Sequence, residues 1–162
     1  MKILLVLIFA PLIAMILFYF FFPGRLVAMG RALLRRRGGM VQKSVAVEGR
    51  VWPYLEGGDP TKPLLLLVHG FAGDKDNWSM IAPYLTRDYH VIAPDLPGFG
   101  QNERNPELAY DIEAQTRRLK GFADALGLGR PHLGGNSMGG WIALRYGIGY
   151  PDALASPVLP HN

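Results

Sequence analysis

The fold is decided by a stretch near the end of the chain, Pro131-His132-Leu133-Gly134-Gly135-Asn136-Ser137-Met138-Gly139-Gly140-Trp141-Ile142-Ala143. Its pattern indicates a short strand, a tight turn that carries one serine, and the start of a helix. Gly135 and Gly139 stand two residues before and two residues after Ser137. This spacing is typical of a nucleophilic serine held in a sharp strand-to-helix turn.

The physical reason for the two glycines is steric. A strained φ angle at Ser137 is needed to lift its hydroxyl above the sheet edge, and the strand and the helix then pass very close together, where only glycine fits. The N–H of Met138 opens the helix, so its positive end faces any oxyanion that forms on Ser137. From this motif alone, a glycine-rich turn without chemistry is an equal alternative.

Two apolar strands precede this turn. The run Leu64–Val68 predicts a buried central parallel strand that leads into His69-Gly70-Phe71, and residues 90–94 predict the next strand, which leads into Asp95. Further expectations are a hairpin over residues 44–55, a short or irregular helix over 77–85, and helices over 109–126 and 138–150. Alternating strands and helices imply a parallel sheet, which brings His69, Asp95 and Ser137 to the carboxyl ends of its strands.

With these three motifs in this order, the sequence over residues 45–151 resembles the α/β-hydrolase superfamily. The resemblance implies the N-terminal part of an α/β-hydrolase fold, a mostly parallel sheet flanked by helices. It also implies Ser137 as the nucleophile and the backbone N–H groups of Phe71 and Met138 as the oxyanion hole. The other motif residues take structural roles, namely His69, Gly70, Asp95, Gly135 and Gly139.

The N-terminal run of residues 3–22, which is uncharged and mostly apolar, makes the chain most similar to membrane-anchored lipases and esterases of the monoacylglycerol-lipase type. This similarity implies cleavage of a small-molecule carboxylic ester, with a lipid-like acyl group, through an acyl-enzyme on Ser137. A serine in place of an aspartate nucleophile disfavours epoxide and haloalkane chemistry, whereas peptide or thioester cleavage remains an alternative. No metal and no organic cofactor are implied.

Composition narrows the function classes further. The chain has 162 residues, of which 49% are hydrophobic and 19% charged, which suits one compact domain. The absence of cysteine excludes disulfides, thiolate zinc sites and cysteine nucleophiles. The net charge of +4 comes largely from arginines between Arg25 and Arg37, so it has a local explanation and does not indicate a nucleic-acid partner. Protein partners are not predictable from the sequence.

The N-terminal residues predict a membrane anchor. Residues 3–22 carry no charge, and a helix of that length would cross a bilayer core of roughly 30 Å. A cleaved signal peptide is the alternative, disfavoured by the long apolar run and by the arginines that follow it. The expected organisation is a transmembrane anchor over residues 1–24, a basic juxtamembrane segment over 25–42, and a hydrolase domain from residue 43.

The arginines after the apolar run also predict orientation. Only Lys2 precedes the run and five arginines follow it, so the positive-inside rule favours a cytoplasmic catalytic domain. The basic segment suits an interfacial helix on anionic headgroups of membrane lipids, and a plain stop-transfer cluster explains it equally well.

The C-terminal end departs from the family pattern. The family order is nucleophile, acid, histidine, and only 25 residues follow Ser137. His90, His132 and His161 are not placed to act as the base, and the two prolines after Ser156 disfavour a central strand. We therefore expect a partial hydrolase domain over residues 43–155, an atypical tail over 156–162 that marks truncation or a frameshift, and impaired activity. The alternative is a non-catalytic, membrane-tethered binding module.

Overall fold

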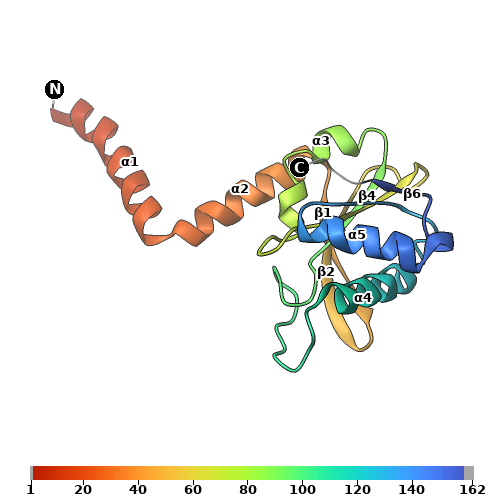
Figure 1. Ribbon diagram of the computed structural model, residues 1–162. Helices are drawn as coiled ribbons and strands as arrows, with labels where there is room; N and C mark the ends of the chain where they lie inside the picture. Colours follow the sequence, from red (N-terminus) through yellow and green to blue (C-terminus); the bar gives the residue numbers. More distant parts are fainter. Residues whose placement is uncertain (1, 159–162) are drawn as a thin grey trace. The chain divides into compact units, whose positions relative to one another are not determined.

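The computed structural model describes the backbone of residues 2–158, and the side chains of these residues apart from residues 2–8, 12, 14, 16, 157 and 158. The chain divides into two compact units, Met1–Leu34 and Arg35–Asn162. Helix α1 (Lys2–Phe21) and most of helix α2 (Pro23–Arg37) belong to the first unit. The second unit contains the sheet and every motif described above (Figure 1).

The apolar N-terminal segment is helical, as its sequence predicts. However, among the residues that the structure describes, no helix combines the length and the apolar character that crossing a membrane requires. The transmembrane helix predicted for residues 3–22 is therefore not supported. Several side chains of that segment lie outside the described residues.

The second unit is built on one mixed sheet with the strand order β1-β2-β4-β3-β5-β6. The strands are β1 (Val41–Val47), β2 (Arg50–Gly57), β3 (Leu64–Val68), β4 (His90–Pro94), β5 (His132–Gly135) and β6 (Ser156–Val158). β1 and β2 form the predicted antiparallel hairpin, which joins the sheet along β4. β4, β3, β5 and β6 run parallel, so the carboxyl ends of β3, β4 and β5 meet at one edge, as predicted.

The helices follow the predicted order with shifted ends. Helix α4 (Ile112–Ala125) begins three residues later than predicted, because the side chain of Asp111 caps it by accepting a hydrogen bond from the Ala114 N–H at 2.8 Å. Helix α5 (Met138–Gly149) follows the serine turn directly. The irregular helix predicted over 77–85 is two short pieces, η1 (Lys75–Trp78) and α3 (Ala82–Leu85), and a last turn η2 (Pro151–Ala153) precedes β6.

The sequence disfavours a central strand after Ser156, and the structure has a short strand there at the edge of the described sheet. Ser156–Val158 pair in parallel with β5, and Pro157 lies opposite Leu133. Proline lacks a backbone N–H, which excludes it from the centre of a sheet but not from an edge strand. β6 is the outermost strand in the described sheet, so the missing donor costs no internal hydrogen bond.

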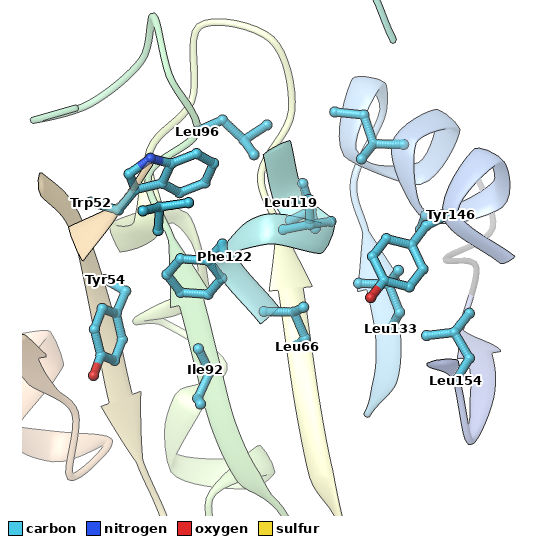
Figure 2. Packing of buried hydrophobic residues seen from close by; sticks show 14 residues of the cluster. Trp52, Tyr54, Leu66, Ile92, Leu96, Leu119, Phe122, Leu133, Tyr146 and Leu154 are labelled. Carbon is cyan, nitrogen blue, oxygen red and sulfur yellow. The ribbon is translucent and has the colours of Figure 1, made fainter. Parts of the chain in front are cut away.

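The core lies on both faces of the sheet because side chains alternate along each strand. Leu66 and Val68 of β3 face the larger cluster, which α4 and α5 cover side by side (Figures 1 and 2). Leu65 and Leu67 face a smaller cluster that includes Ala82 of α3. With apolar side chains on both faces, β3 is the buried central strand that its uninterrupted leucines predict.

Candidate active site

Ser137 occupies a strained and exposed turn between β5 and α5. Its φ of 52° and ψ of −119° lie outside the regions that ordinary L-residues favour. The strain persists because the glycines allow a close approach: a Cβ on Gly135 would overlap the Gly139 carbonyl, and a Cβ on Gly139 would overlap the Val68 carbonyl. Neither glycine has room for a side chain, and Ser137 is left exposed at the N-terminus of α5.

The turn after β3 lies directly beside this serine. The Gly73 N–H donates to the Gly70 carbonyl at 3.1 Å and closes the turn, in which Ala72 has a φ of 56°. A Cβ on Gly70 would lie 3.3 Å from the Cβ of Ser137, so only glycine allows this approach without displacement. The structure thus brings together the turn that contains Phe71 and the turn that contains Ser137.

The two backbone N–H groups predicted to bind an oxyanion have no hydrogen-bond acceptor among the described residues. Among the residues that the structure describes, the N–H groups of Phe71 and Met138 donate to no backbone carbonyl, whereas the neighbouring Gly73, Gly139 and Gly140 N–H groups do. Met138 is the first residue of α5, where N–H groups lack partners within the helix. Both N–H groups are therefore available to an oxygen atom on a ligand.

His69 is buried, and both of its ring nitrogens have hydrogen-bond partners in the backbone. Its Nε2 accepts a hydrogen bond from the Leu96 N–H at 3.1 Å, so its Nδ1 carries the proton and donates to the Gly70 carbonyl at 2.8 Å. These two bonds require the neutral imidazole. Burial lowers the pKa of His69 from its ordinary value of 6.5, and the hydrogen bond to the Gly70 carbonyl opposes that shift only in part.

We expect the stability of the protein to fall as the pH drops below about 6.5, the unfolded-state pKa of histidine. The unfolded chain takes up a proton at His69 in this range and the folded chain does not, so the free energy of unfolding decreases with a slope approaching about 1.4 kcal/mol per pH unit. Denaturant unfolding between pH 7.5 and 5.5 measures this decrease. His69→Gln is expected to remove the contribution of His69 to the slope. An unchanged slope in that variant would contradict the view that His69 causes the pH dependence.

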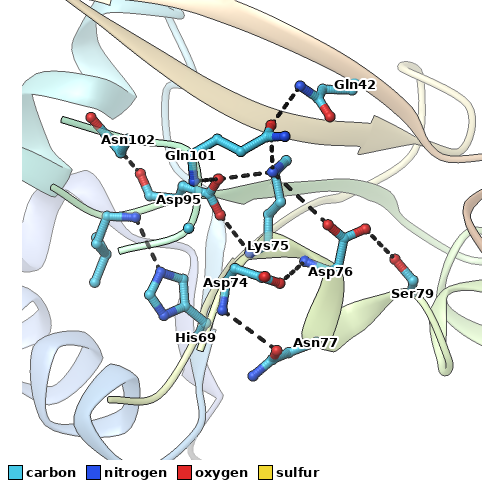
Figure 3. Close-up of polar contacts among 12 residues, drawn as sticks. Gln42, His69, Asp74, Lys75, Asp76, Asn77, Ser79, Asp95, Gln101 and Asn102 are labelled. Atoms are coloured by element: carbon cyan, nitrogen blue, oxygen red, sulfur yellow. Dashed lines mark hydrogen bonds and ion pairs between the residues drawn. The ribbon is translucent and has the colours of Figure 1, made fainter. Parts of the chain in front are cut away.

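Asp95 binds both its own loop and Lys75 through its carboxylate. Its Oδ2 does accept a hydrogen bond from the Gln101 N–H within its own loop, at 2.8 Å. The same carboxylate also accepts the Lys75 backbone N–H at 2.7 Å and the Lys75 Nζ at 2.8 Å (Figure 3). A Cβ on Gly100 would overlap the Asp95 carboxylate. Lys75 was not predicted from the sequence, where it reads as one of several charges in a polar loop.

The other histidines in the described part of the chain have partners of their own, and Ser137 is not among them. His90 Nε2 lies 2.9 Å from Glu56 Oε1, and His132 Nδ1 lies 2.7 Å from the Ser156 hydroxyl. Burial favours the protonated form of Glu56, but hydrogen bonds from Lys43 and His90 outweigh it and lower the Glu56 pKa. His161 lies outside the described residues. Within residues 2–158, no cluster of three or more side chains suits a metal ion.

A cavity of about 470 Å³ opens beside the turn that contains Phe71. The aromatic rings of Phe71 and Phe99 meet edge to face at its wall, 5.7 Å apart. The Tyr110 hydroxyl donates to the Asn105 carbonyl at 2.8 Å and fixes the loop on the far wall. The remaining lining residues are Gly98, Arg104 and Pro106. This cavity is mainly apolar and lies next to the turn of Phe71, which adjoins Ser137. Its size suits a small apolar group of a ligand.

Comparisons with known proteins agree with this geometry. A family model described as the alpha/beta hydrolase fold matches residues 63–159. Lipase 1 of Psychrobacter immobilis is 41% identical over 124 residues, which are 75% of this chain and 39% of that protein. A monoacylglycerol lipase of Homo sapiens is 31% identical over 149 residues, 90% of this chain and 44% of that protein. The crystal structure of a bacterial membrane phospholipase A superposes with a TM-score of 0.82 and 43% identity, over 98% of this chain and 51% of that one.

The strained serine turn on a mostly parallel sheet and the match of the family model together define the class: the chain belongs to the alpha/beta hydrolase fold family. Within the family it is lipase- and esterase-like by resemblance, as predicted. The chain spans less than half the length of the two curated lipases.

Proposed function

We propose that this chain carries the nucleophile and the oxyanion hole of a serine ester hydrolase. The observation that supports this most strongly is the exposed Ser137, strained at the N-terminus of α5 and adjacent to the turn of Gly70 and Phe71. Backbone strain at one exposed serine lowers the stability of the protein, and such strain is found mainly at active sites and ligand-binding sites.

In this mechanism the Ser137 hydroxyl attacks the ester carbonyl and gives its proton to a histidine base. The carbonyl oxygen becomes an oxyanion that accepts hydrogen bonds from the Phe71 and Met138 N–H groups, each worth about 3 to 4 kcal/mol of transition-state stabilisation. The alcohol leaves with that proton, and water then hydrolyses the acyl-enzyme. Each described histidine is bonded elsewhere, so we assign the base and its acid partner to residues outside those described.

The proposed substrate is a carboxylic ester with an apolar, lipid-like acyl group. The cavity beside Phe71 has mostly apolar walls. The Phe71 side chain is 77% exposed and Trp141, one turn into α5, is 65% exposed, so apolar surface flanks the serine turn. The names of the lipase relatives are consistent with this class of ester.

We also propose that the protein works at a lipid surface. The N-terminal segment is apolar, and the helix that follows it ends in three arginines. Arg36 and Arg37 suit anionic headgroups, whereas Arg35 pairs with Asp76. A cytoplasmic location of the catalytic unit remains a prediction from the charge pattern.

The test is labelling with a fluorophosphonate probe, which reacts only with an activated serine. Wherever the unchanged protein is labelled, in this chain or in one continued beyond residue 162, we expect the control variant Ser44→Ala, which removes an exposed serine on β1, to keep the labelling and Ser137→Ala to lose it. Separate assay of membrane and soluble fractions tests the proposed location.

Each outcome decides between the candidate functions. Labelling that requires a chain continued beyond residue 162 would mean that the base and acid lie in that continuation. The absence of labelling in either chain would contradict the hydrolase proposal and favour a non-catalytic binding module, since no described histidine bonds to Ser137.

A further inference from the structure

A buried ion pair lies next to the candidate site and takes no part in the proposed chemistry. Lys75 and Asp95 are joined through Nζ and Oδ2 at 2.8 Å, and their side chains are 1% and 0% exposed. Removing two charges from water is costly, and an apolar pair of similar volume often gives equal or greater stability. The pair therefore calls for a role beyond stability.

The pair is the centre of a polar network that connects η1, the loop after β4 and the end of helix α2 (Figure 3). Lys75 Nζ donates a second hydrogen bond to Gln101 Oε1 at 3.1 Å, in the loop after β4. The next residue, Asp76, accepts two hydrogen bonds from Arg35, at 2.5 and 2.6 Å. The Asn102 side chain donates to the Asp95 carbonyl at 2.6 Å. The carboxylate and the backbone carbonyl of Asp95 thus both accept hydrogen bonds from this network.

The same network holds the oxyanion turn at both ends. Before the turn, His69 accepts the Leu96 N–H; after it, Lys75 is bound through its backbone N–H and its ammonium group to Asp95. Asp95 and Leu96 are the first two residues after β4, so both anchors lie at the carboxyl end of that strand. Phe71 lies between the two anchors, in the turn that touches Ser137.

We propose that Lys75 and Asp95 are positioning residues that hold the Phe71 N–H toward the oxyanion on Ser137. The inference rests on the proposed function, because it assigns these residues a role in that same site. An oxyanion donor stabilises the transition state only if it is already oriented when charge develops, and a misplacement of 1 Å is costly. One carboxylate that binds both the backbone and the side chain of residue 75 removes the rotational freedom that a single hydrogen bond leaves.

The test compares Lys75→Met with Lys120→Met, which removes a partly exposed lysine paired with Asp124 on α4. Lys75→Met keeps the length of the side chain and loses its charge. We expect amide hydrogen exchange at Gly73 and at residue 75 to accelerate at least about tenfold in Lys75→Met, with exchange in β5 and α4 unchanged. The rate of labelling at saturating fluorophosphonate is expected to fall by about 100-fold with little change in the half-saturating concentration. Lys120→Met is expected to change neither.

A second variant guards against loss of folding. Asp95→Asn keeps the shape of the side chain and one acceptor oxygen, and is expected to give the same local acceleration and a smaller loss of labelling. Unchanged exchange at Gly73 in both variants, or acceleration spread evenly over the chain, would overturn the inference. If neither this chain nor one continued beyond residue 162 is labelled, the proposed function fails, while the exchange measurement still decides whether the pair positions the turn.

Discussion

Gly139→Ala is expected to lower the free energy of unfolding by about 3 kcal/mol or more and to abolish fluorophosphonate labelling. A Cβ on Gly139 would overlap the Val68 carbonyl and lie 2.7 Å from the His69 carbonyl. Both are backbone atoms at the end of the central strand, so relief of the overlap requires α5 to move away from β3. That movement displaces Ser137, which immediately precedes α5, from the turn of Gly70.

Gly140→Ala is the matched control at the next position. A Cβ there would meet the Gly135 carbonyl at 3.5 Å, an ordinary contact. Alanine also favours a helix over glycine, so this variant is expected to be as stable as the unchanged protein or up to about 1 kcal/mol more stable. Denaturant unfolding followed by circular dichroism measures both variants. If Gly139→Ala and Gly140→Ala destabilise the protein equally, the close contact of Gly139 with the end of β3 is not the reason that position 139 requires glycine.

Phe122→Ala is expected to destabilise the protein by about 3 to 5 kcal/mol, the usual cost of removing a buried aromatic ring. Phe122 is 0% exposed, and its ring lies 5.4 Å from that of Trp52 and 5.6 Å from that of Tyr54 (Figure 2). It therefore joins α4 to the hairpin strand β2. Its loss leaves a cavity at the centre of the larger cluster, which rigid strands on one side cannot fill.

Phe71→Ala makes the same chemical change at a side chain that is 77% exposed. We expect a change in the free energy of unfolding within about 0.5 kcal/mol, since little area is buried. The variant keeps the backbone N–H proposed for the oxyanion hole, so it removes only the apolar surface beside the cavity. A loss of stability equal to that of Phe122→Ala would contradict the view that burial separates the two phenylalanines.

Regular elements were predictable where the local pattern has one reading. β4 has the predicted bounds, His90–Pro94, because its apolar run is bounded by polar residues and a turn. The start of α4 was not predicted correctly, because that required recognising Asp111 as the residue that caps the helix. The edge strand β6 was missed because the effect of Pro157 depends on whether the strand has a neighbour on both sides, which is a property of the assembled sheet.

The proximity of Ser137 to the turn of Phe71 could be predicted, since both follow strands that end at the same edge of a parallel sheet. The role of Lys75 could not. In the sequence Asp74-Lys75-Asp76, alternating charges are typical of a solvated loop, and nothing local distinguishes the buried lysine from its neighbours. That burial is made tolerable mainly by Asp95, 20 residues away, together with Gln101.

The sequence by itself determined the class of fold and the position of the serine turn, because glycine spacing and apolar runs act through local sterics and strand periodicity. Only the tertiary structure decided which charges are buried, which proline lies at an edge, and which backbone N–H groups remain without an internal partner. These depend on contacts between segments far apart in the chain, where the free energy of a charge or a hydrogen bond is set by what surrounds it.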